Sequence, residues 1–326
     1  GGAYAVNIQN GGTIGNAGKA QIVGDEFSQL SAENGMKMSY WYTSNGLQNI
    51  TNMVQFARAN NKTIHGHTLV WHRCYQVPSG WSNQSSQQYR QTYINHIEDV
   101  ASQYQDVITS WDVVNEALWD GADDSADSSC GLQSGGQTVD GVNYRRSTHF
   151  DKLGADYIDL AFRTARAAAP NADLYYNDFN TENNYSDNGY NKTDNLVALI
   201  RDLRDRGTPI DGVGFQMHVG PDWPSVGSIT AAWRKILDLN YGLKIKLTEI
   251  DVRVSWPYGN PPTFITSCAD AQALASQKQR YKDIVAAYFD TVPAELRGGV
   301  TVWGLADSDS WYATLDDGSL GCPLLF

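Results

Sequence analysis

The sequence predicts a single α/β domain built as a (β/α)8 TIM barrel. Along its 326 residues, short apolar runs rich in Val, Ile, Tyr and Trp alternate with longer amphipathic segments. Such short runs are typical of strands that are buried on both faces, as parallel strands are. The sequence has no low-complexity linker and no tandem repeat. We therefore expect residues 1–326 to form one domain.

Eight segments have the length and composition of buried strands. In chain order they are Ala3–Ile8, Met36–Tyr40, Thr63–Trp71, Val107–Val114, Ala172–Phe179, Gly212–Val219, Ile245–Val252 and Gly299–Leu305. A doubly wound open sheet would also alternate strands with helices, but no Gly-rich phosphate loop follows the first of these strands. The barrel is therefore the better prediction.

Seven segments between these strands have the spacing of amphipathic helices. They are Lys19–Ser31, Leu47–Asn60, Ser85–Tyr104, Asp151–Ala169, Lys192–Arg206, Ile229–Asn240 and Ala271–Asp290. Pro170 follows the fourth helix and Gly207 follows the fifth, and both residue types commonly end helices. Because the chain ends soon after the eighth strand, we expect the final helix to be short or absent.

The charge balance excludes several classes of partner. The 24 Lys and Arg against 36 Asp and Glu give a formal net charge of −12, which argues against binding to nucleic acid or an anionic membrane. No apolar run approaches the roughly 18 residues that a membrane span needs. The first residues lack a basic-then-apolar signal pattern, so we expect any secretion signal to have been removed.

Cysteines and glycosylation motifs indicate a secreted, extracellular glycoprotein. Five N-x-S/T motifs begin at Asn49, Asn61, Asn83, Asn184 and Asn191. Four cysteines include no C-x-x-C pair, which disfavours zinc and redox chemistry. Four cysteines can form two disulfides in three ways. The barrel favours the pairing Cys74–Cys130 with Cys268–Cys322. For an enzyme of this size we expect a monomer.

The candidate site follows from the rule that barrel active sites lie at the carboxyl ends of the strands. The fourth strand ends in Asn115 and Glu116, and the seventh ends in Thr248-Glu249-Ile250-Asp251. Other polar and aromatic residues fall near the ends of the third, sixth and eighth strands: His65, His67, His72, Gln216, His218, Trp303, Asp307, Asp309 and Trp311. Carboxylates, histidines and tryptophans are thus predicted to share one rim.

Two facing carboxylates are what glycoside hydrolysis needs, one protonated and one ionised. The fourth and seventh strands lie on opposite sides of the ring, so Glu116 and Glu249 can flank a sugar. Their carboxyl groups would be about 5–5.5 Å apart in a retaining enzyme and roughly 6.5–9.5 Å apart in an inverting one. As the acid, Glu116 needs a pKa raised from about 4.3 toward roughly 6 by burial and by the charge of Glu249. Asn115 can bind a sugar hydroxyl, and Asp251 can orient His218.

Other interpretations remain open at this stage. His65 and His67 could bind a metal, but we see no acidic ligand at a matching place, so we expect no metal and no cofactor. Either glutamate could be a rim ion pair, and the same barrel could serve as a non-catalytic carbohydrate-binding or inhibitor protein. Such a protein would most often have lost one glutamate, and this chain keeps both. We expect Trp303 and Trp311 to face the sugar.

The motifs around these residues resemble those of glycoside hydrolase family 10, the retaining (β/α)8 xylanases. They are ENGMK at Glu33–Lys37, GHTLVWH at Gly66–His72, WDVVNEAL at Trp111–Leu118, YNDFN at Tyr176–Asn180, QMH at Gln216–His218, TEID at Thr248–Asp251 and TVWGLAD at Thr301–Asp307. The resemblance implies that Glu116 is the acid/base and Glu249 the nucleophile. It implies substrate-binding roles for Asn34, Lys37, His67, Trp71, His72, Asn115, Gln216, His218, Trp303 and Trp311.

The chain also departs from the family pattern where the substrate would be recognised. Family xylanases usually follow the MK pair with Trp and a Glu-Pro turn, whereas here it is followed by Met38, Ser39, Tyr40 and Trp41. Cys74 replaces a usual Gln. The loops Trp119–Tyr144 and Ser255–Cys268 look enlarged on the leaving-group side. The resemblance implies an endo-β-1,4-xylanase acting on xylan. The alternative is a tomatinase-type hydrolase of the same family, which would release the intact sugar chain from α-tomatine.

Overall fold

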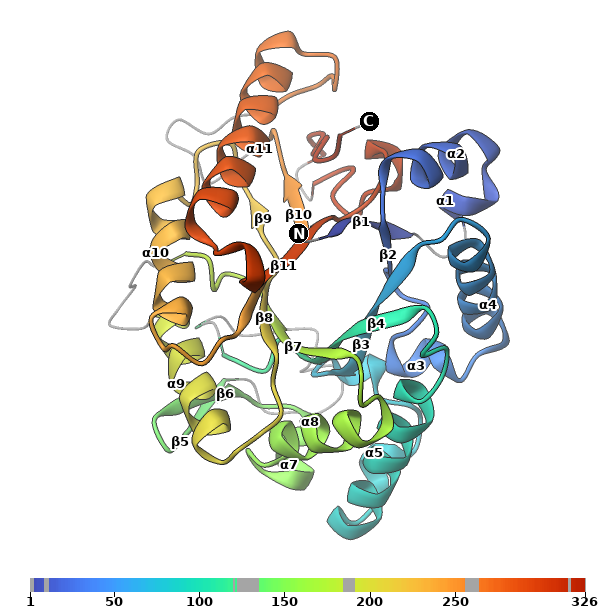
Figure 1. Ribbon diagram of the computed structural model, residues 1–326, viewed down its shortest axis with the longest axis vertical. Coiled ribbons are helices and arrows are strands. Elements are labelled where there is room, and N and C mark those ends of the chain that lie inside the picture. The colour runs from blue at the N-terminus through green and yellow to red at the C-terminus, as the bar shows by residue number, and fades with distance from the viewer. Residues whose placement is uncertain are drawn as a thin grey trace.

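A computed structural model describes residues 3–8, 12–119, 121, 135–183, 191–255, 264–315 and 318–325. Figure 1 shows a central ring of strands enclosed by helices. The ring consists of eight parallel strands: β1 (Ala3–Ile8), β2 (Gln29–Ala32), β3 (Thr63–Trp71), β4 (Ile108–Asn115), β7 (Asp173–Asp178), β8 (Gly212–Phe215), β10 (Lys244–Val252) and β11 (Arg297–Val302). They pair in this order, and β11 closes the ring by pairing with both β10 and β1. The predicted (β/α)8 barrel is confirmed.

The main helices pack around the outside of this ring (Figure 1). They are α2 (Ala17–Glu26), α4 (Ser44–Ala59), α5 (Ser86–Ala101), α7 (Thr148–Leu153), α8 (Tyr157–Ala168), α9 (Lys192–Asp205), α10 (Val226–Leu237) and α11 (Ala271–Thr291). Several begin at a side-chain cap, and Ser85 forms a reciprocal capping box with Gln88. Among the described residues, no helix is both long enough and apolar enough to cross a membrane.

Shorter elements connect the strands to the helices. They are α1 (Gly12–Gly15), α3 (Met38–Trp41), the hairpin of β5 (Gly136–Val139) and β6 (Val142–Arg145), β9 (His218–Val219), and the one-turn 3₁₀ helices η1 (Cys74–Gln76), η2 (Trp81–Asn83), η3 (Ala294–Leu296) and η4 (Asp307–Asp309). The strand β9 continues beyond β8 and pairs with the carboxyl end of β10, where Asp251 lies opposite His218. This pairing extends the wall of the barrel on the side where Glu249 lies.

The second strand was predicted in the wrong place. It is formed by Gln29–Ala32, whereas Met38–Trp41, which overlaps the predicted strand Met36–Tyr40, forms a helical turn. Gln29 is a polar residue buried in the barrel, where its amide donates to Thr63 Oγ1 at 3.2 Å and accepts from Lys246 Nζ at 2.8 Å. Because the side chains inside this barrel are partly polar, β2 lacks the apolar pattern that identified the other strands.

Two predicted helices differ from the structure. The predicted helix Lys19–Ser31 ends earlier, at Glu26, because Gln29–Ser31 belong to β2. The segment Asp151–Ala169 was expected to be continuous, but it is divided into α7 and α8. Gly154 ends α7 with a φ of 69°, a left-handed conformation that glycine adopts at little cost. The chain therefore turns between the two helices without leaving the barrel wall.

One of the two predicted disulfides is confirmed. Cys268 and Cys322 are bonded, with their Cα atoms 5.6 Å apart, and the bond ties the loop after β10 to the end of the chain. Cys74 lies in η1, but Cys130 is outside the described residues, so the second pair stays a prediction. Asn184 and most of the loops Trp119–Tyr144 and Ser255–Cys268 also lie outside them.

Candidate active site

A cavity of about 230 Å³ opens at the carboxyl ends of the barrel strands. It is lined by Glu33, Asn34, Lys37, His67, Trp71, Asn115, Glu116, Gln216, His218, Glu249, Trp303 and Trp311. Both predicted catalytic glutamates and nine of the ten predicted substrate-binding residues thus meet in one place. The tenth, His72, lies behind the wall, with its Nδ1 atom 3.6 Å from Glu116 Oε2. Glu33 is an additional lining residue from the ENGMK motif.

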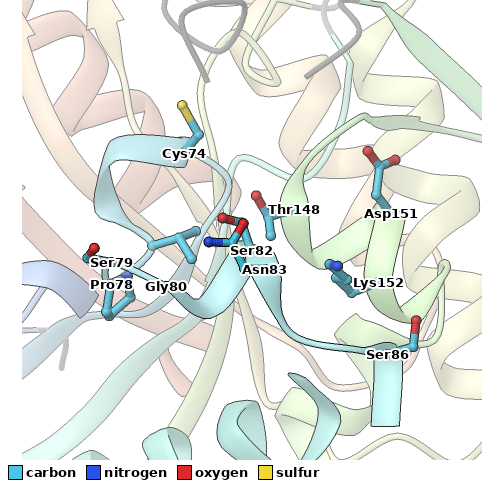
Figure 2. Close-up of a pocket in the computed structure, with 11 residues that line it drawn as sticks. Cys74, Pro78, Ser79, Gly80, Ser82, Asn83, Ser86, Thr148, Asp151 and Lys152 are labelled. Carbon is cyan, nitrogen blue, oxygen red and sulfur yellow. The ribbon is translucent and has the colours of Figure 1, made fainter. Parts of the chain in front are cut away.

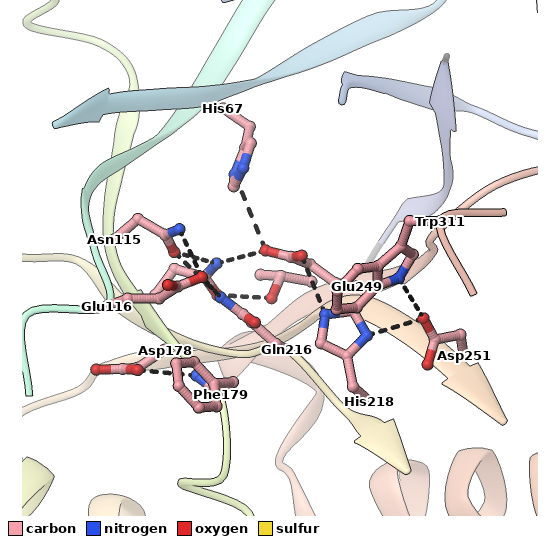
Figure 3. A network of polar contacts seen from close by, with 12 residues as sticks. His67, Asn115, Glu116, Asp178, Phe179, Gln216, His218, Glu249, Asp251 and Trp311 are labelled. Atoms are coloured by element: carbon pink, nitrogen blue, oxygen red, sulfur yellow. Dashed lines mark hydrogen bonds and ion pairs between the residues drawn. The ribbon is translucent and has the colours of Figure 1, made fainter. Parts of the chain in front are cut away.

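Glu249 lies within β10 and is held by a protonated imidazole and an amide (Figure 3). Asn177 Nδ2 donates to Glu249 Oε1 at 2.8 Å, and His218 Nε2 lies 3.3 Å from Oε2. The other ring nitrogen of His218 lies 2.8 Å from Asp251 Oδ2, where Asp251 was predicted to orient it. Burial lowers the pKa of His218, but Asp251 and Glu249 outweigh it and raise that pKa to about 10. His218 is therefore an imidazolium that donates to both carboxylates.

Glu116 follows the last residue of β4 and is held by neutral donors. Trp71 Nε1 donates to Oε2 at 2.8 Å, and Gln216 Nε2 donates to Oε1 at 3.0 Å. Burial raises the pKa of Glu116, but the charges of His72 and Arg145 and these two hydrogen bonds lower it to about 2. The raised pKa expected from the sequence is therefore wrong for the free protein, in which Glu116 is ionised.

Two amides join the glutamates into one network. Asn115 Oδ1 accepts from Asn177 Nδ2 at 2.9 Å and from Gln216 Nε2 at 3.3 Å, while Asn115 Nδ2 donates to Glu116 at 3.2 Å. Sequence reasoning missed Asn177 as a site residue, although it quoted the YNDFN motif that contains it. The available signal was its position, because a polar residue near the carboxyl end of a barrel strand faces the site.

The rest of the cavity offers a cation and aromatic faces. Lys37 Nζ donates to Asn34 Oδ1 at 3.0 Å and lies 4.5 Å from the ring centre of Trp71, and burial lowers the pKa of Lys37. Trp311 is 49% exposed at the rim, with its Nε1 donating to Asp251 at 3.1 Å. Trp303 is buried and packs edge-on against His67 at 5.2 Å. Trp311 is thus the aromatic side chain that offers its surface to a ligand.

The predicted lack of an acidic partner for His65 and His67 is wrong. Asp112 lies between them, with its oxygens 3.0 Å from His65 Nε2 and 2.8 Å from His67 Nδ1. Burial raises the pKa of Asp112, but the two histidines outweigh it and hold that pKa well below its usual value. The group is explained as a buried network of polar contacts around Asp112, which fixes the ring of His67 beside Glu249.

Among the described residues, the side chains that meet as a possible metal-ligand group are Cys268, Asp307 and Cys322. The two cysteines are bonded to each other, so their sulfur atoms are not thiolate ligands. This group gives no support to a metal site.

A second, larger cavity of about 700 Å³ lies between η1, η2 and the start of α7 (Figure 2). Its described lining includes Cys74, Asn83, Thr148, Asp151 and Lys152. The carboxylate in this lining is Asp151, so the described residues do not provide the facing carboxylates of the first cavity. The chemistry predicted from the sequence therefore belongs to the smaller cavity.

A barrel with two carboxylates facing one cavity, flanked by amides and an exposed indole, has the design of a glycoside-hydrolysing site. The sequence profile of glycosyl hydrolase family 10 matches residues 2–326. The chain belongs to this family, which confirms the resemblance.

Characterised relatives agree in sequence and structure. The chain is 47% identical over 320 residues to endo-1,4-beta-xylanase A of Cellvibrio japonicus, covering 96% of this chain and 50% of the relative. It is 40% identical to endo-beta-1,4-xylanase Xyn10C of the same organism, covering 95% and 50%. The chain thus spans about half the length of these relatives.

Solved structures match along the entire chain. A thermostable mutant of xylanase Xyn10A from Cellvibrio japonicus has a TM-score of 0.88 at 45% identity, with 100% of this chain and 92% of that chain covered. A mutant of xylanase A from P. fluorescens subsp. cellulosa in complex with xylopentaose has a TM-score of 0.89 at 43% identity, with 100% and 93% covered. The barrel is therefore shared with these xylanases.

Proposed function

We propose that this protein is a retaining endo-β-1,4-xylanase that cuts xylan chains internally. The observation that carries the proposal is the placement of Glu116 and Glu249 on one cavity, each carboxylate fixed by its own set of donors. The relatives are about twice as long as this chain. Their names therefore do not establish the activity of the whole protein, and we propose that activity as well.

Glu249 acts as the nucleophile. The imidazolium of His218 and the amide of Asn177 donate to its oxygens, which holds the carboxylate in a fixed position at the cavity. One oxygen attacks the anomeric carbon of the bound sugar, and a glycosyl ester forms as the bond from that carbon to the glycosidic oxygen breaks.

Glu116 acts first as the acid and then as the base. It gives a proton to the departing glycosidic oxygen, and its carboxylate later takes a proton from the water that hydrolyses the ester and frees Glu249. The pKa of about 2 leaves Glu116 ionised in the free protein. The proton must therefore be taken up as substrate binds, because a sugar in the cavity expels water and desolvation raises the pKa of a carboxyl group.

The xylan proposal is supported by the relatives, which are named xylanases, and by a neighbour whose structure holds xylopentaose. The tomatinase alternative rested on the departures at Met38 and Cys74 and on two loops that lie largely outside the described residues. The xylanase relatives named above give it no support. A polymer such as xylan is too large to enter a cell, so this function is consistent with the secreted location predicted from the sequence. The monomeric state stays a prediction.

The test is a product analysis of xylan and α-tomatine with wild type, Glu249→Ala and the control Glu295→Ala. Glu295 is exposed on η3, away from the cavity. We expect xylo-oligosaccharides from xylan with wild type and control, and a loss on the order of 10⁴- to 10⁶-fold in Glu249→Ala. A tetrasaccharide released from tomatine, with little product from xylan, would reverse the substrate assignment. No product from either substrate would refute the enzymatic proposal.

A further inference from the structure

The backbone of Glu116 has a conformation that its own residue type does not favour. Its φ is 58°, in the left-handed region, immediately after the regular strand β4 ends at Asn115. Residues other than glycine seldom adopt this conformation, and they keep it only where surrounding contacts hold them there. The position of the Glu116 carboxyl group therefore depends on whatever holds this turn.

Groups of β7 hold the turn through three successive backbone N–H groups. The N–H of Glu116 donates to the carbonyl oxygen of Asn177 at 2.9 Å. The next N–H, of Ala117, donates to Tyr176 Oη at 3.0 Å, and that of Leu118 donates to Asp178 Oδ2 at 3.3 Å. After the first bond, side chains of β7 thus replace the backbone groups that a regular sheet would supply.

These two side chains are themselves fixed by a buried lysine. Tyr176 Oη donates to Asp178 Oδ2 at 2.5 Å, and Lys192 Nζ donates to Asp178 Oδ1 at 2.8 Å. Tyr176 and Asp178 are fully buried, and Lys192 is 5% exposed. Lys192 is the first residue of α9, and its Nζ also lies 3.7 Å from the ring centre of Phe179. Figure 3 shows Asp178 and Phe179 beside the Glu116 and Gln216 side chains.

The alternation of side chains along β7 separates this network from the one around Glu249. Successive residues of a strand point to opposite faces. Asn177 donates to Glu249 and Asn115, whereas Tyr176 and Asp178 reach the turn that carries Glu116. One strand therefore serves both carboxylates, through different residues.

We infer that Tyr176, Asp178 and Lys192 are positioning residues for Glu116, which keep its carboxyl group aligned with the glycosidic oxygen. The inference rests on the proposed function. An ion pair buried this deeply is costly to desolvate and is weak evidence for stability by itself. Asp178 of this ion pair and its partner Tyr176 accept from the backbone N–H groups of the turn that carries Glu116. We therefore expect the loss of the ion pair to impair proton transfer more than folding.

The experiment compares two aryl β-xylobiosides that differ in their need for an acid, one with phenol and one with dinitrophenol as leaving group. Tyr176→Phe removes the hydroxyl that accepts from the Ala117 N–H. Lys192→Met removes the positive charge that pairs with the Asp178 carboxylate. Tyr93→Phe is the matched control, because Tyr93 is equally buried but its hydroxyl donates to the carbonyl of Tyr157 at 3.0 Å. The readout is the ratio of kcat/KM for the two substrates, which does not depend on the fraction of folded enzyme.

We expect Tyr176→Phe and Lys192→Met to lower kcat/KM for the phenyl substrate by about tenfold or more and for the dinitrophenyl substrate by about twofold at most. The control should leave the ratio unchanged. An unchanged ratio in Tyr176→Phe would overturn the inference, even if Lys192→Met fails to fold. If wild type hydrolyses neither substrate, the proposed function fails and the inference fails with it.

Discussion

The two carboxylates of the site are held in different ways. Glu249 lies inside the regular strand β10 and accepts from the imidazolium of His218, so a full positive charge lies in direct contact with its carboxylate. Glu116 lies beyond the end of β4, on a left-handed turn, and accepts from the neutral N–H groups of Trp71 and Gln216.

This difference matches the two tasks that hydrolysis sets. A nucleophile must stay ionised, and a charged partner in direct contact ensures this. An acid/base must change its charge twice in each cycle, so it needs contacts that fix its position and that a protonated carboxyl group can also satisfy. A charged group thus donates directly to Glu249, whereas the direct donors to Glu116 are neutral and the charge of His72 acts on it from 3.6 Å.

Replacing Glu116 gives the largest effect that distinguishes the two roles. Glu116→Ala should lower activity on xylan by roughly 10²- to 10⁴-fold, because the poor leaving group needs a proton. The first step on a dinitrophenyl substrate should be nearly unaffected, since that leaving group departs without one. Pre-steady-state kinetics of dinitrophenol release measures this step. Equal losses on both substrates would argue against the acid role.

His218 should make the free energy of unfolding depend on pH. This prediction tests whether Glu249 has a charged partner. Its pKa is raised from 6.5 to about 10, so protonation stabilises the folded state. The contribution, on the order of a few kcal/mol, is fully present below about pH 6.5 and is lost as the pH rises through about 10. The difference in free energy of unfolding between wild type and His218→Asn should therefore shrink from pH 6 to pH 10. A difference that does not change with pH would contradict the imidazolium assignment.

Replacing His72 should have a smaller effect, and that effect should fall on the pKa of Glu116. Its charge is the first of the contributions that lower the pKa of Glu116 against burial. His72→Gln should raise that pKa and move the basic limb of kcat, which reports the enzyme–substrate complex, upward by about one pH unit. The control variant is His96→Gln. His96 is also a buried histidine, and it forms hydrogen bonds with Tyr42 and with the Leu69 carbonyl oxygen. A limb that stays in place in His72→Gln would show that His72 is not charged beside Glu116.

Much of this site could be predicted from the sequence, because barrel strands place their ends on one rim. The pattern of buried strands led to Glu116 just after β4 and to Glu249 on β10, and both line the cavity. The strand β2 was misplaced because Gln29 is a polar residue inside the barrel, bonded to Lys246 from the other side of the ring. Periodicity in one segment carries no information about such a distant partner.

The electrostatics of the site could not be predicted in the same way. The lowered pKa of Glu116 depends on donors from two other parts of the barrel, Trp71 at the end of β3 and Gln216 after β8. Likewise, Asp112 on β4 pairs with two histidines of β3 through contacts that only the folded barrel creates. The sequence indicated which residues share the rim, whereas their charge states follow from distances.

The most direct test of the central claim is to trap the glycosyl ester on Glu249. Wild type would be incubated with a fluorinated xylobioside carrying a dinitrophenyl leaving group, digested, and analysed by mass spectrometry. We predict that the peptide containing Glu249 gains the mass of the fluorinated disaccharide, and that Glu249→Ala gains nothing. A label on Glu116, or turnover of the reagent through an inverted product without any label, would contradict the double-displacement account.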